Sequence, residues 1–302
     1  MQIGITLPQM GLDASPAAIT SIAQEAERLD FASLWVGERL LRPRHFVAYG
    51  GRGSRAIPDF QKINYEPLET LTYVAAKTER IKLGTSVINA FFQAPVVMAR
   101  RLATLDQFSA GRLIVGLGQG WMKEEFDTAN VSLQRRGNGL EDYMGALRAV
   151  WGPDPVHYEG RFYNIVESDI APKPVQPGGP PVLFAANSQA VIERAARLAD
   201  GLNPVLYSWE AIEALARDFP ALVRDAGRDP SQTVIIARVN NGIHAQALPD
   251  PRPPLVGSLD QIHDDMHRLA QLGINHVFYD LTLIPVQEQP KLLEQLRRAA
   301  DI

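Results

Sequence analysis

Short apolar segments that resemble buried strands alternate along the chain with longer segments whose apolar residues recur every three to four positions. The strand-like segments cover residues 2–7, 33–37, 81–87, 112–118, 181–186, 202–206, 233–239 and 276–280. Several of them are apolar throughout, as expected of parallel strands that are buried on both faces. The pattern therefore predicts eight strand–helix units in succession.

Helix start signals lie between these strands. Ser15 precedes a proline at the first position of a predicted helix, and Pro95 opens a later helix with Leu102 and Phe108 facing inward. Further helices are expected over residues 138–151, from Ser188, and after the capping pair Ser258 and Gln261. Eight such units predict a (β/α)8 TIM barrel, with residues 1–302 forming a single domain. An open doubly wound sheet is the rival arrangement, but it would suit a shorter chain.

Two segments are long for plain connections. Residues 40–66 follow the second strand and are rich in Arg, Gly and Pro, whereas residues 152–180 come between the fourth and fifth strands and contain a predicted short hairpin. We interpret them as insertions after strands 2 and 4. Long loops in a compact domain are usually functional or mobile, so these two are expected to shape the substrate site.

Composition narrows the class of protein. The net charge of -4 argues against a sequence-independent nucleic-acid binder, which usually carries a basic face. The absence of cysteine removes disulfides, thiolate metal sites and cysteine nucleophiles, and it fits a reducing compartment. The N-terminus shows no secretory signal pattern, and no apolar run is long enough to span a bilayer. We therefore expect a soluble cytoplasmic protein that acts on a small molecule.

In a barrel of this kind the functional site lies at the C-terminal ends of the strands. The residues at those positions are mostly polar, neutral or aromatic, and they include Gln9, Asn240 and Asp280. They supply no ligand set for a metal, no lysine for a Schiff base, and no Ser-His-Asp arrangement, so a metal-dependent hydrolase is disfavoured. Such a lining suits an organic cofactor that carries out the reaction itself.

Some motifs have both a structural and a functional interpretation. Gly116, Gly118 and Gly120 form either a tight turn or a close backbone approach to a ligand. Asn187 and Ser188 begin a helix, where they either bind a phosphate group or simply cap the helix.

Charged and aromatic residues near strand ends have similar alternatives. Glu124 and Glu125 are expected in a solvated first helical turn. Trp35 is expected in the core. Phe91, Phe92 and Trp121 either line a substrate pocket or pack ordinarily; of these we assign Phe91 and Trp121 to the pocket.

Five segments together resemble the luciferase-like monooxygenase superfamily, and particularly its branch that depends on the deazaflavin coenzyme F420. They are SLWVGER at 33–39, RIKLGTSVIN at 80–89, ARRLATLDQFSAGRLIVGLGQGWMKEEF at 99–126, PPVLFAANSQAVIERAARLADG at 180–201 and GSLDQIHDDMHRLAQLGINHVFYD at 257–280. The resemblance runs in order over nearly the whole chain. It implies a barrel of the bacterial luciferase-like type whose cofactor ring lies at the strand ends.

The resemblance also implies roles for individual residues. It implies a non-proline cis peptide at Ser86-Val87 behind the ring, with Asn89 at the polar edge of the ring. Gln119 and Gly120 are expected along the cofactor side chain. Asn187 and Ser188 are expected to bind its phosphate, and Ala186 beside them is expected to contact the cofactor.

The chain departs from its sugar-phosphate-oxidising relatives at two places. It has Glu38-Arg39 where they carry an acid–histidine pair, and Trp121 where they carry a glutamate, so sugar-phosphate oxidation is not expected. Glu38 and Arg39 remain the candidate catalytic residues. Glu38 would position a hydroxyl and Arg39 would bind an anionic group, unless the two form a salt bridge with each other.

The resemblance thus predicts an oxidoreductase that transfers a hydride between F420 and a small organic substrate. The alternatives are a monooxygenase that uses reduced FMN and O₂, and a non-catalytic flavin-binding protein. A homodimer is expected, with residues 68–80 and 95–110 as the candidate interface.

Overall fold

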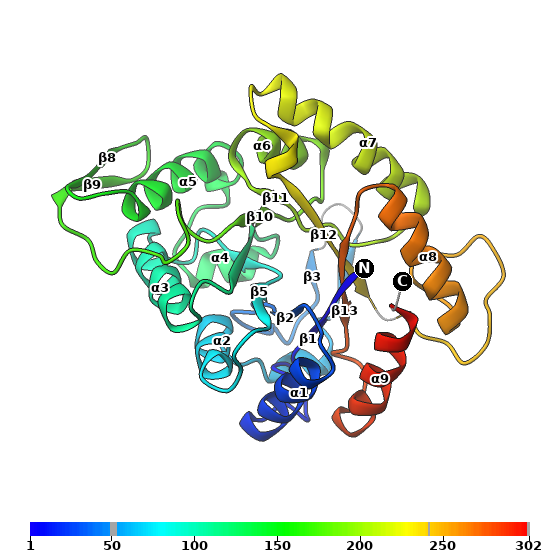
Figure 1. Cartoon of the computed structure of the whole chain (residues 1–302). Coiled ribbons are helices and arrows are strands. Elements are labelled where there is room, and N and C mark those ends of the chain that lie inside the picture. The colour runs from blue at the N-terminus through cyan, green and yellow to red at the C-terminus, as the bar shows by residue number, and fades with distance from the viewer. Residues whose placement is uncertain (49–52, 241, 301–302) are drawn as a thin grey trace.

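In the part of the chain that the computed structural model describes, residues 1–48, 53–240 and 242–300, eight parallel strands form a closed barrel (Figure 1). These strands are β1 (Gln2–Thr6), β2 (Ser33–Val36), β5 (Lys82–Thr85), β7 (Leu113–Gly118), β10 (Val182–Phe184), β11 (Gly201–Leu202), β12 (Val234–Asn240) and β13 (His276–Asp280). Each strand pairs with the next in this order, including β7 with β10, and β13 pairs with β1 to close the ring. The barrel prediction is therefore confirmed, and the open sheet is wrong.

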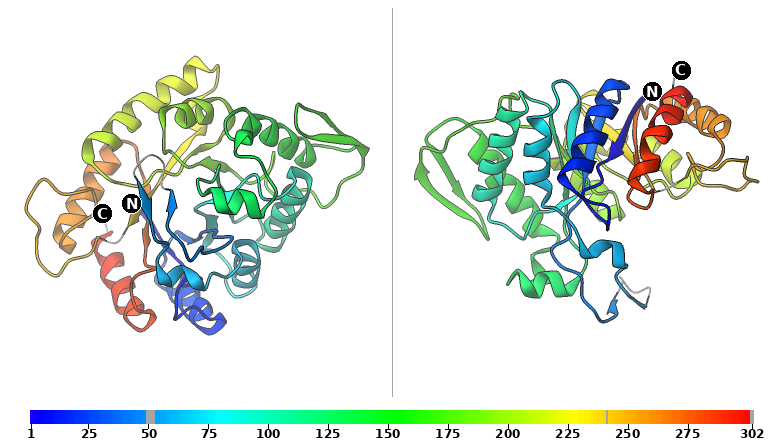
Figure 2. Two further views of the ribbon diagram at one scale, coloured as in Figure 1. Left: turned by 180° about the vertical axis from the view of Figure 1, so that it is seen from behind. Right: turned by 90° about the horizontal axis from the view of Figure 1, so that it is seen from below.

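The helices surround the barrel on its outside, except for α4, which lies at the end of the barrel where loops follow the strands (Figure 2). They are α1 (Pro16–Arg28), α2 (Pro67–Ala75), α3 (Pro95–Phe108), α4 (Lys123–Thr128), α5 (Asn138–Trp151), α6 (Gln189–Leu198), α7 (Trp209–Asp225), α8 (Leu259–Gln271) and α9 (Gln289–Ala299). Ser15 caps α1 through Ala18 N–H, and Ser258 and Gln261 form the predicted reciprocal cap of α8. Phe108 was expected to face inward but is exposed, because it is the last residue of α3. None of the described helices has the length and apolar character needed to cross a membrane.

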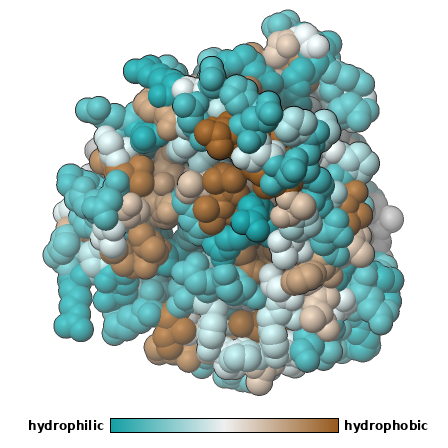
Figure 3. Space-filling view, turned by 90° about the vertical axis from the view of Figure 1, so that its left-hand side faces the viewer, coloured by the Kyte–Doolittle hydropathy of each residue, from teal (hydrophilic) through white to brown (hydrophobic). Residues whose placement is uncertain are grey.

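The two long segments carry small substructures of their own. The first contains the antiparallel pair β3 (Val47–Ala48) and β4 (Ser54–Arg55), followed by the 3₁₀ turn η1 (Asp59–Lys62); residues 49–52 lie outside the described part. The second contains the predicted hairpin, β8 (Val156–Glu159) with β9 (Asn164–Ser168). Short 3₁₀ turns also occur elsewhere: η2 (Leu133–Arg135), η3 (Pro230–Gln232) and η4 (Val286–Glu288). The face that carries α3 and this hairpin is mainly hydrophilic, with apolar residues in separate patches (Figure 3).

A layer of large side chains fills the middle of the barrel. Trp35 is fully buried there and stacks on Phe278 with ring centroids 4.4 Å apart. The neighbouring strands make room for the indole, because a β-carbon on Gly84 would lie 2.5 Å from the Trp35 ring and one on Gly4 would lie 3.0 Å from Trp35 Nε1. The rest of the layer consists of Ile114, Leu183 and Ile236. Trp35 is therefore a core residue, as predicted, and the layer forms a solid floor beneath the strand ends.

The third barrel strand is interrupted beside the glycine motif. It pauses at the Ser86-Val87 peptide, which is cis as expected, and resumes as β6 (Ile88–Asn89) paired with β7. A β-carbon on Gly116 would lie 2.0 Å from the Thr85 carbonyl oxygen, and one on Gly118 would lie 2.6 Å from Val87. Gly116 and Gly118 therefore allow close packing between strands. This role differs from the tight turn and from the close approach to a ligand that the sequence suggested.

Candidate functional site

A cavity of about 470 Å³ opens at the C-terminal ends of the strands. It lies where barrel enzymes place their sites. Strand ends and the loops that follow them supply its wall: Gln9, Glu38, Arg39, Gln61, Ser86, Val87, Asn89, Phe92, Gly120, Trp121, Glu125, Arg238, Asn240, Asp280 and Leu283, among others. The predicted residues Glu38, Arg39, Ser86, Val87, Asn89, Gly120 and Trp121 are therefore brought together around one cavity.

Glu38 is a carboxyl group at the cavity wall with an altered affinity for protons. Burial raises its pKa to about 7, although the Asn89 N–H, which donates to its Oε2 at 2.6 Å, opposes the rise. The negative charges of Glu66 and Glu125 raise this pKa further. A carboxyl group whose pKa lies near the working pH can both accept and donate a proton during a reaction.

Arg39 forms its ion pair with Glu125 and not with Glu38, the partner considered from the sequence. It forms an ion pair with Glu125 at 3.0 Å, and its Nε donates to Gln61 at 3.0 Å. The proposed salt bridge between Glu38 and Arg39 is therefore wrong. Glu125, which was expected in a solvated turn, is only 5% exposed and also accepts the Leu40 N–H at 2.9 Å. The expectation of a solvated turn fails for Glu125 because α4 turns this residue toward the cavity.

Trp121 completes this wall. The guanidinium of Arg39 lies 5.5 Å from the centroid of the Trp121 ring, and that of Arg55 lies 5.0 Å from it. Phe91, in contrast, does not line the cavity: it is 3% exposed and packs in the core, near Phe126 and Tyr143. The assignment of Phe91 to the substrate pocket is wrong, and its neighbour Phe92 occupies the cavity wall.

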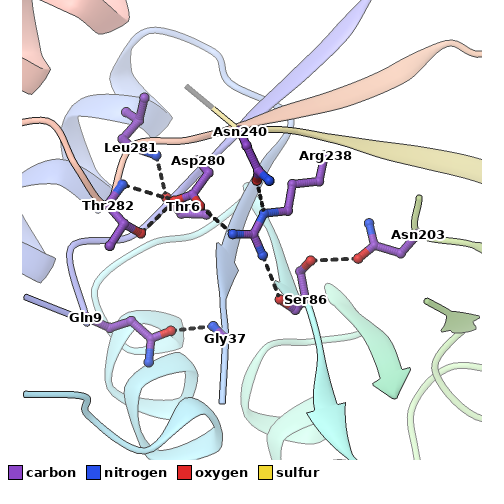
Figure 4. A network of polar contacts seen from close by, with 10 residues as sticks. All are labelled: Thr6, Gln9, Gly37, Ser86, Asn203, Arg238, Asn240, Asp280, Leu281 and Thr282. Carbon is purple, nitrogen blue, oxygen red and sulfur yellow. Dashed lines mark hydrogen bonds and ion pairs between the residues drawn. The ribbon is translucent and has the colours of Figure 1, made fainter. Parts of the chain in front are cut away.

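A network of polar residues forms the opposite wall (Figure 4). Arg238 is paired with Asp280, donates to Asn240 at 2.8 Å and reaches the Ser86 carbonyl oxygen at 3.4 Å. The Ser86 hydroxyl in turn donates to Asn203 at 2.6 Å. The network thus holds the cis peptide segment from the side of the barrel interior.

Asp280 is the acidic centre of this network. Burial alone would raise its pKa, but the charge of Arg238 and hydrogen bonds from Thr282 bring the pKa below its usual value. Thr6 also donates to the Asp280 carboxylate at 3.2 Å. Asp280 therefore stays ionised and neutralises Arg238.

Sequence reasoning missed four residues of this network that act through their side chains: Thr6, Asn203, Arg238 and Thr282. Asp280 and Asn240 had been recognised as strand ends without a role. A usable signal existed for Arg238, because residues two apart on a strand share a face, and Asn240 at the mouth places Arg238 on the inner face below it.

A second hollow of about 310 Å³ adjoins the cavity, and Gly118 lines both. It contains the predicted Gln119, Asn187 and Ser188, together with Arg136 and Arg194. Ser188 has the backbone of a helix cap, but its side chain makes no capping hydrogen bond within the described residues. Ala186 lines neither space, since it packs against the core.

The side-chain amide of Asn89, which lines the cavity, has a hydrogen-bond donor without an acceptor in the described part of the chain. Its amide Nδ2 is buried and has no hydrogen-bond partner among the described residues, while its Oδ1 accepts the Phe91 N–H at 3.0 Å. Gly120, with a φ of +62°, allows this arrangement, because a β-carbon there would lie 2.2 Å from Asn89 Nδ2. A buried donor left unpaired is costly, so this amide is suited to a ligand oxygen.

Metal chemistry finds little support at this site. Across residues 1–48, 53–240 and 242–300, no three His, Asp or Glu side chains lie close enough together to hold a metal ion.

Comparison with known proteins gives a family match and several relatives. Residues 1–241 match the family model described as luciferase-like monooxygenase. An uncharacterized protein of Mycobacterium tuberculosis is 30% identical over 284 residues, covering 93% of this chain and 92% of that protein. An F420-dependent glucose-6-phosphate dehydrogenase of Amycolatopsis mediterranei is 29% identical, covering 87% of this chain and 79% of that protein. An FMNH(2)-dependent dimethylsulfone monooxygenase of Pseudomonas putida is 30% identical over 149 residues, covering 48% of this chain and 41% of that protein.

Solved structures show the same fold at lower identity. An F420-dependent secondary alcohol dehydrogenase in complex with an F420-acetone adduct has a TM-score of 0.79 and 17% identity, covering 100% of this chain and 99% of that chain. The monooxygenase RslO1 of Streptomyces bottropensis has a TM-score of 0.79 and 20% identity, covering 99% and 98%.

Proposed function

This chain belongs to the luciferase-like monooxygenase family, and we propose that it transfers a hydride between coenzyme F420 and a small organic substrate. One observation carries the proposal. The buried Asn89 Nδ2, which has no hydrogen-bond partner in the described part of the chain, and the Glu38 carboxyl group lie at the wall of one cavity, and the Asn89 N–H donates to Glu38. The first group is suited to a cofactor oxygen and the second to a proton of the substrate.

The residues present fit a deazaflavin. The Asn89 Nδ2 would donate to a carbonyl oxygen at the edge of the ring, with Ser86 and Val87 behind the ring. The adjoining hollow would take the phosphate-bearing side chain, because Arg136 and Arg194 supply positive charge and Ser188 supplies a hydroxyl at a helix start. Gln119 lines the adjoining hollow, and its Oε1 accepts the Gly137 N–H at 2.5 Å.

The bound cofactor would accept or donate the hydride, and Glu38 would accept or donate the proton of the substrate's oxygen. With an alcohol as substrate, the Glu38 carboxylate would accept the hydroxyl proton, and the bound cofactor would supply the hydride acceptor for the carbon. In the reverse direction, protonated Glu38 returns that proton to the carbonyl oxygen. A pKa of about 7 lets Glu38 perform either task near neutral pH.

The substrate is expected to be uncharged. Arg39 is paired with Glu125, and Arg238 is paired with Asp280, so the two arginines of the cavity wall are already neutralised. Trp121 lies beside Arg39 and supplies an apolar surface. These residues support the view that the chain does not oxidise a sugar phosphate, although sugar-phosphate dehydrogenases are among its relatives.

The second candidate keeps the fold and changes the cofactor to reduced FMN, with O₂ as the oxidant. The match to the FMNH(2)-dependent relative supports it, but that match covers 48% of the chain, against 87% for the F420-dependent relative. We therefore rank F420 first.

Parallel fluorescence titrations with F420 and FMN, each oxidised and reduced, test the proposal. Tight binding of F420 and weak binding of FMN is the expected result, and Asn89→Leu should weaken F420 binding because it removes the donor. Preference for reduced FMN would transfer the proposal to oxygen chemistry. Binding of F420 without turnover of any alcohol or carbonyl compound would instead support the non-catalytic flavin-binding alternative.

We also propose that the protein is a homodimer. A groove between α2 and α3 is lined by the apolar residues Leu68, Val96 and Leu105, and beside them Tyr73 and Val97 are 41% and 49% exposed. Burying such side chains against a second copy is favourable. Sedimentation should give a dimer, and Val97→Glu should shift it toward the monomer.

A further inference from the structure

Two histidines on α8, far from the cavity, form a separate pair. His263 and His267 are four residues apart, so they lie on the same face of the helix one turn from each other. Their Nε2 atoms are 3.1 Å apart, and the two rings meet nearly at right angles, with centroids 4.7 Å apart. The proposed oxidoreductase chemistry uses neither residue.

A backbone contact fixes the orientation of one ring. His263 Nδ1 lies 2.9 Å from the carbonyl oxygen of Ala299, at the end of α9. Since a carbonyl oxygen accepts hydrogen bonds, the proton of His263 sits on Nδ1, and Nε2 presents a lone pair toward His267. Metal-bound histidines commonly have this arrangement, in which the second ring nitrogen donates to a carbonyl oxygen.

We propose that His263 and His267 bind a divalent late transition-metal ion through their Nε2 atoms. Zinc–nitrogen bonds are about 2.0–2.1 Å long. Two nitrogens that are 3.1 Å apart and at that distance from one ion enclose an angle of about 100°, which suits tetrahedral or square-planar coordination. The ion takes the place of the proton that His267 Nε2 now donates to His263, this proton moves to Nδ1 of the same ring, and a modest rotation of the exposed His267 ring directs its Nε2 lone pair at the ion.

Neighbouring charges favour a cation at this place. Asp260 and Asp264 each lie three residues before one of the histidines on the same helix and are exposed. In the described residues they do not complete a cluster of three ligands, so water is expected to fill the remaining positions. A site with two imidazole ligands should bind Cu²⁺ more tightly than Ni²⁺ or Zn²⁺, as the general order of affinities requires.

The site also joins two helices. Because His263 bonds to the end of α9, an ion that holds His263 in place favours the folded arrangement of α8 and α9. An ion that binds only the folded state raises the unfolding temperature, and the stabilisation grows with the logarithm of the ratio of its free concentration to its Kd.

Equilibrium dialysis of tag-free protein with Cu²⁺, Ni²⁺ and Zn²⁺ tests the proposal, and electron paramagnetic resonance of the copper form identifies the ligands. We expect one Cu²⁺ per chain with splitting from two nitrogens, and a rise in unfolding temperature. His263→Gln and His267→Gln should each weaken binding by at least the roughly 10–100-fold that loss of an outer partner costs. His157→Gln, at an exposed histidine on β8, is the matched control and should bind as the parent does.

Two results would overturn the proposal. One is copper binding that both His263→Gln and His267→Gln leave unchanged, and the other is a resonance spectrum that lacks the contribution of two nitrogens. His267 is exposed, so circular dichroism of His267→Gln should match that of the parent and thereby separate loss of the site from loss of the fold.

Discussion

The backbone of Gly118 approaches the side chain of Val87 so closely that a β-carbon at position 118 would lie 2.6 Å from Val87 Cγ2. Gly118 lines both the main cavity and the adjoining hollow, and Val87 lines the main cavity. The contact therefore sets the position of the wall against which a ring would lie.

Gly118→Ala should destabilise the protein by about 1–3 kcal/mol, the usual range for overpacking a well-filled site. Gly139→Ala is the matched control, since its β-carbon would meet only side chains at 3.5 Å or more in a helix. Replacing a helical glycine with alanine stabilises by about 0.4–1 kcal/mol where the site allows it. Urea unfolding measures both, and equal stability of the two variants would contradict the tight contact.

Glu38→Gln should lower kcat/KM by about 10²–10⁴-fold, the usual contribution of general acid–base catalysis, while still accepting the Asn89 N–H. For alcohol oxidation the carboxylate form is needed, so kcat/KM of the parent should fall as the pH drops through about 7. In Glu66→Gln the midpoint should move to lower pH, because a negative charge that raises the pKa of Glu38 is gone. A pH profile of Glu38→Gln that keeps the same midpoint would assign the ionisation to another group.

The same carboxyl group makes the folding stability depend on pH. The pKa of Glu38 rises from 4.5 to about 7 on folding, so its favourable contribution is complete below pH 4.5 and is lost as the pH rises through about 7. Glu38→Gln cannot ionise and should be more stable than the parent at about pH 8, by at most roughly 3 kcal/mol. This stability advantage of the variant should vanish at about pH 4, because Glu38 of the parent is then protonated and as neutral as the glutamine of the variant. Urea unfolding at the two pH values gives the comparison.

Arg39→Met should destabilise the protein by about 3–5 kcal/mol, because it leaves the buried Glu125 carboxylate without its ion-pair partner. The double variant Arg39→Met with Glu125→Gln removes both charges and should recover much of the loss. A double-mutant cycle by chemical denaturation measures the coupling. Full additivity of the two single changes would show that the pair contributes nothing.

His276 should make the protein sensitive to acid. It is buried at the lower end of the barrel, 2.7 Å from the Ser33 hydroxyl, and burial lowers its pKa from 6.5 to about 3. Between these two values the unfolded chain therefore binds a proton at His276 that the folded chain does not bind, and the contribution of His276 to stability falls by about 1.4 kcal/mol per pH unit as the pH drops through that window. Glu38 contributes with the opposite sign between about pH 4.5 and pH 7, so the two effects offset each other in the parent.

His276→Asn removes this contribution, so the stability of the variant relative to the parent should rise by about 1.4 kcal/mol per unit as the pH drops below about 6.5, whatever its effect at pH 7. His157→Gln, at an exposed site, should leave the dependence unchanged. Unfolding free energies between about pH 4 and pH 7 decide the matter. A difference in unfolding free energy between His276→Asn and the parent that stays constant over this range would show that His276 is not the residue responsible.

The fold followed from local properties of the chain. Runs of apolar residues and helix starts such as Ser15 are set by neighbours in sequence, so eight strands and the intervening helices were predicted. The strand-end rule then brought Glu38 and Asn89 to the cavity. The family resemblance, rather than any periodicity, supplied the cis peptide at Ser86-Val87.

The errors came from partners that are distant in sequence. Whether Glu125 faces solvent or Arg39 depends on the path of a separate loop, and nothing near Glu125 reveals that path. The choice between Phe91 and Phe92 depends on how the chain leaves the interrupted strand. Arg238 was missed because it lies inside an apolar strand, although its inward register followed from that of Asn240.

The layer formed by Trp35 and Phe278 has a kinetic consequence. Because these rings fill the barrel beneath the cavity, the two reactants share the entrance on the loop side. If the cofactor lies against Ser86 and Val87 with its side chain in the adjoining hollow, it lies deeper than the substrate and must arrive first. Turnover should then follow a compulsory order in which the substrate is the last to enter and its product is the first to leave.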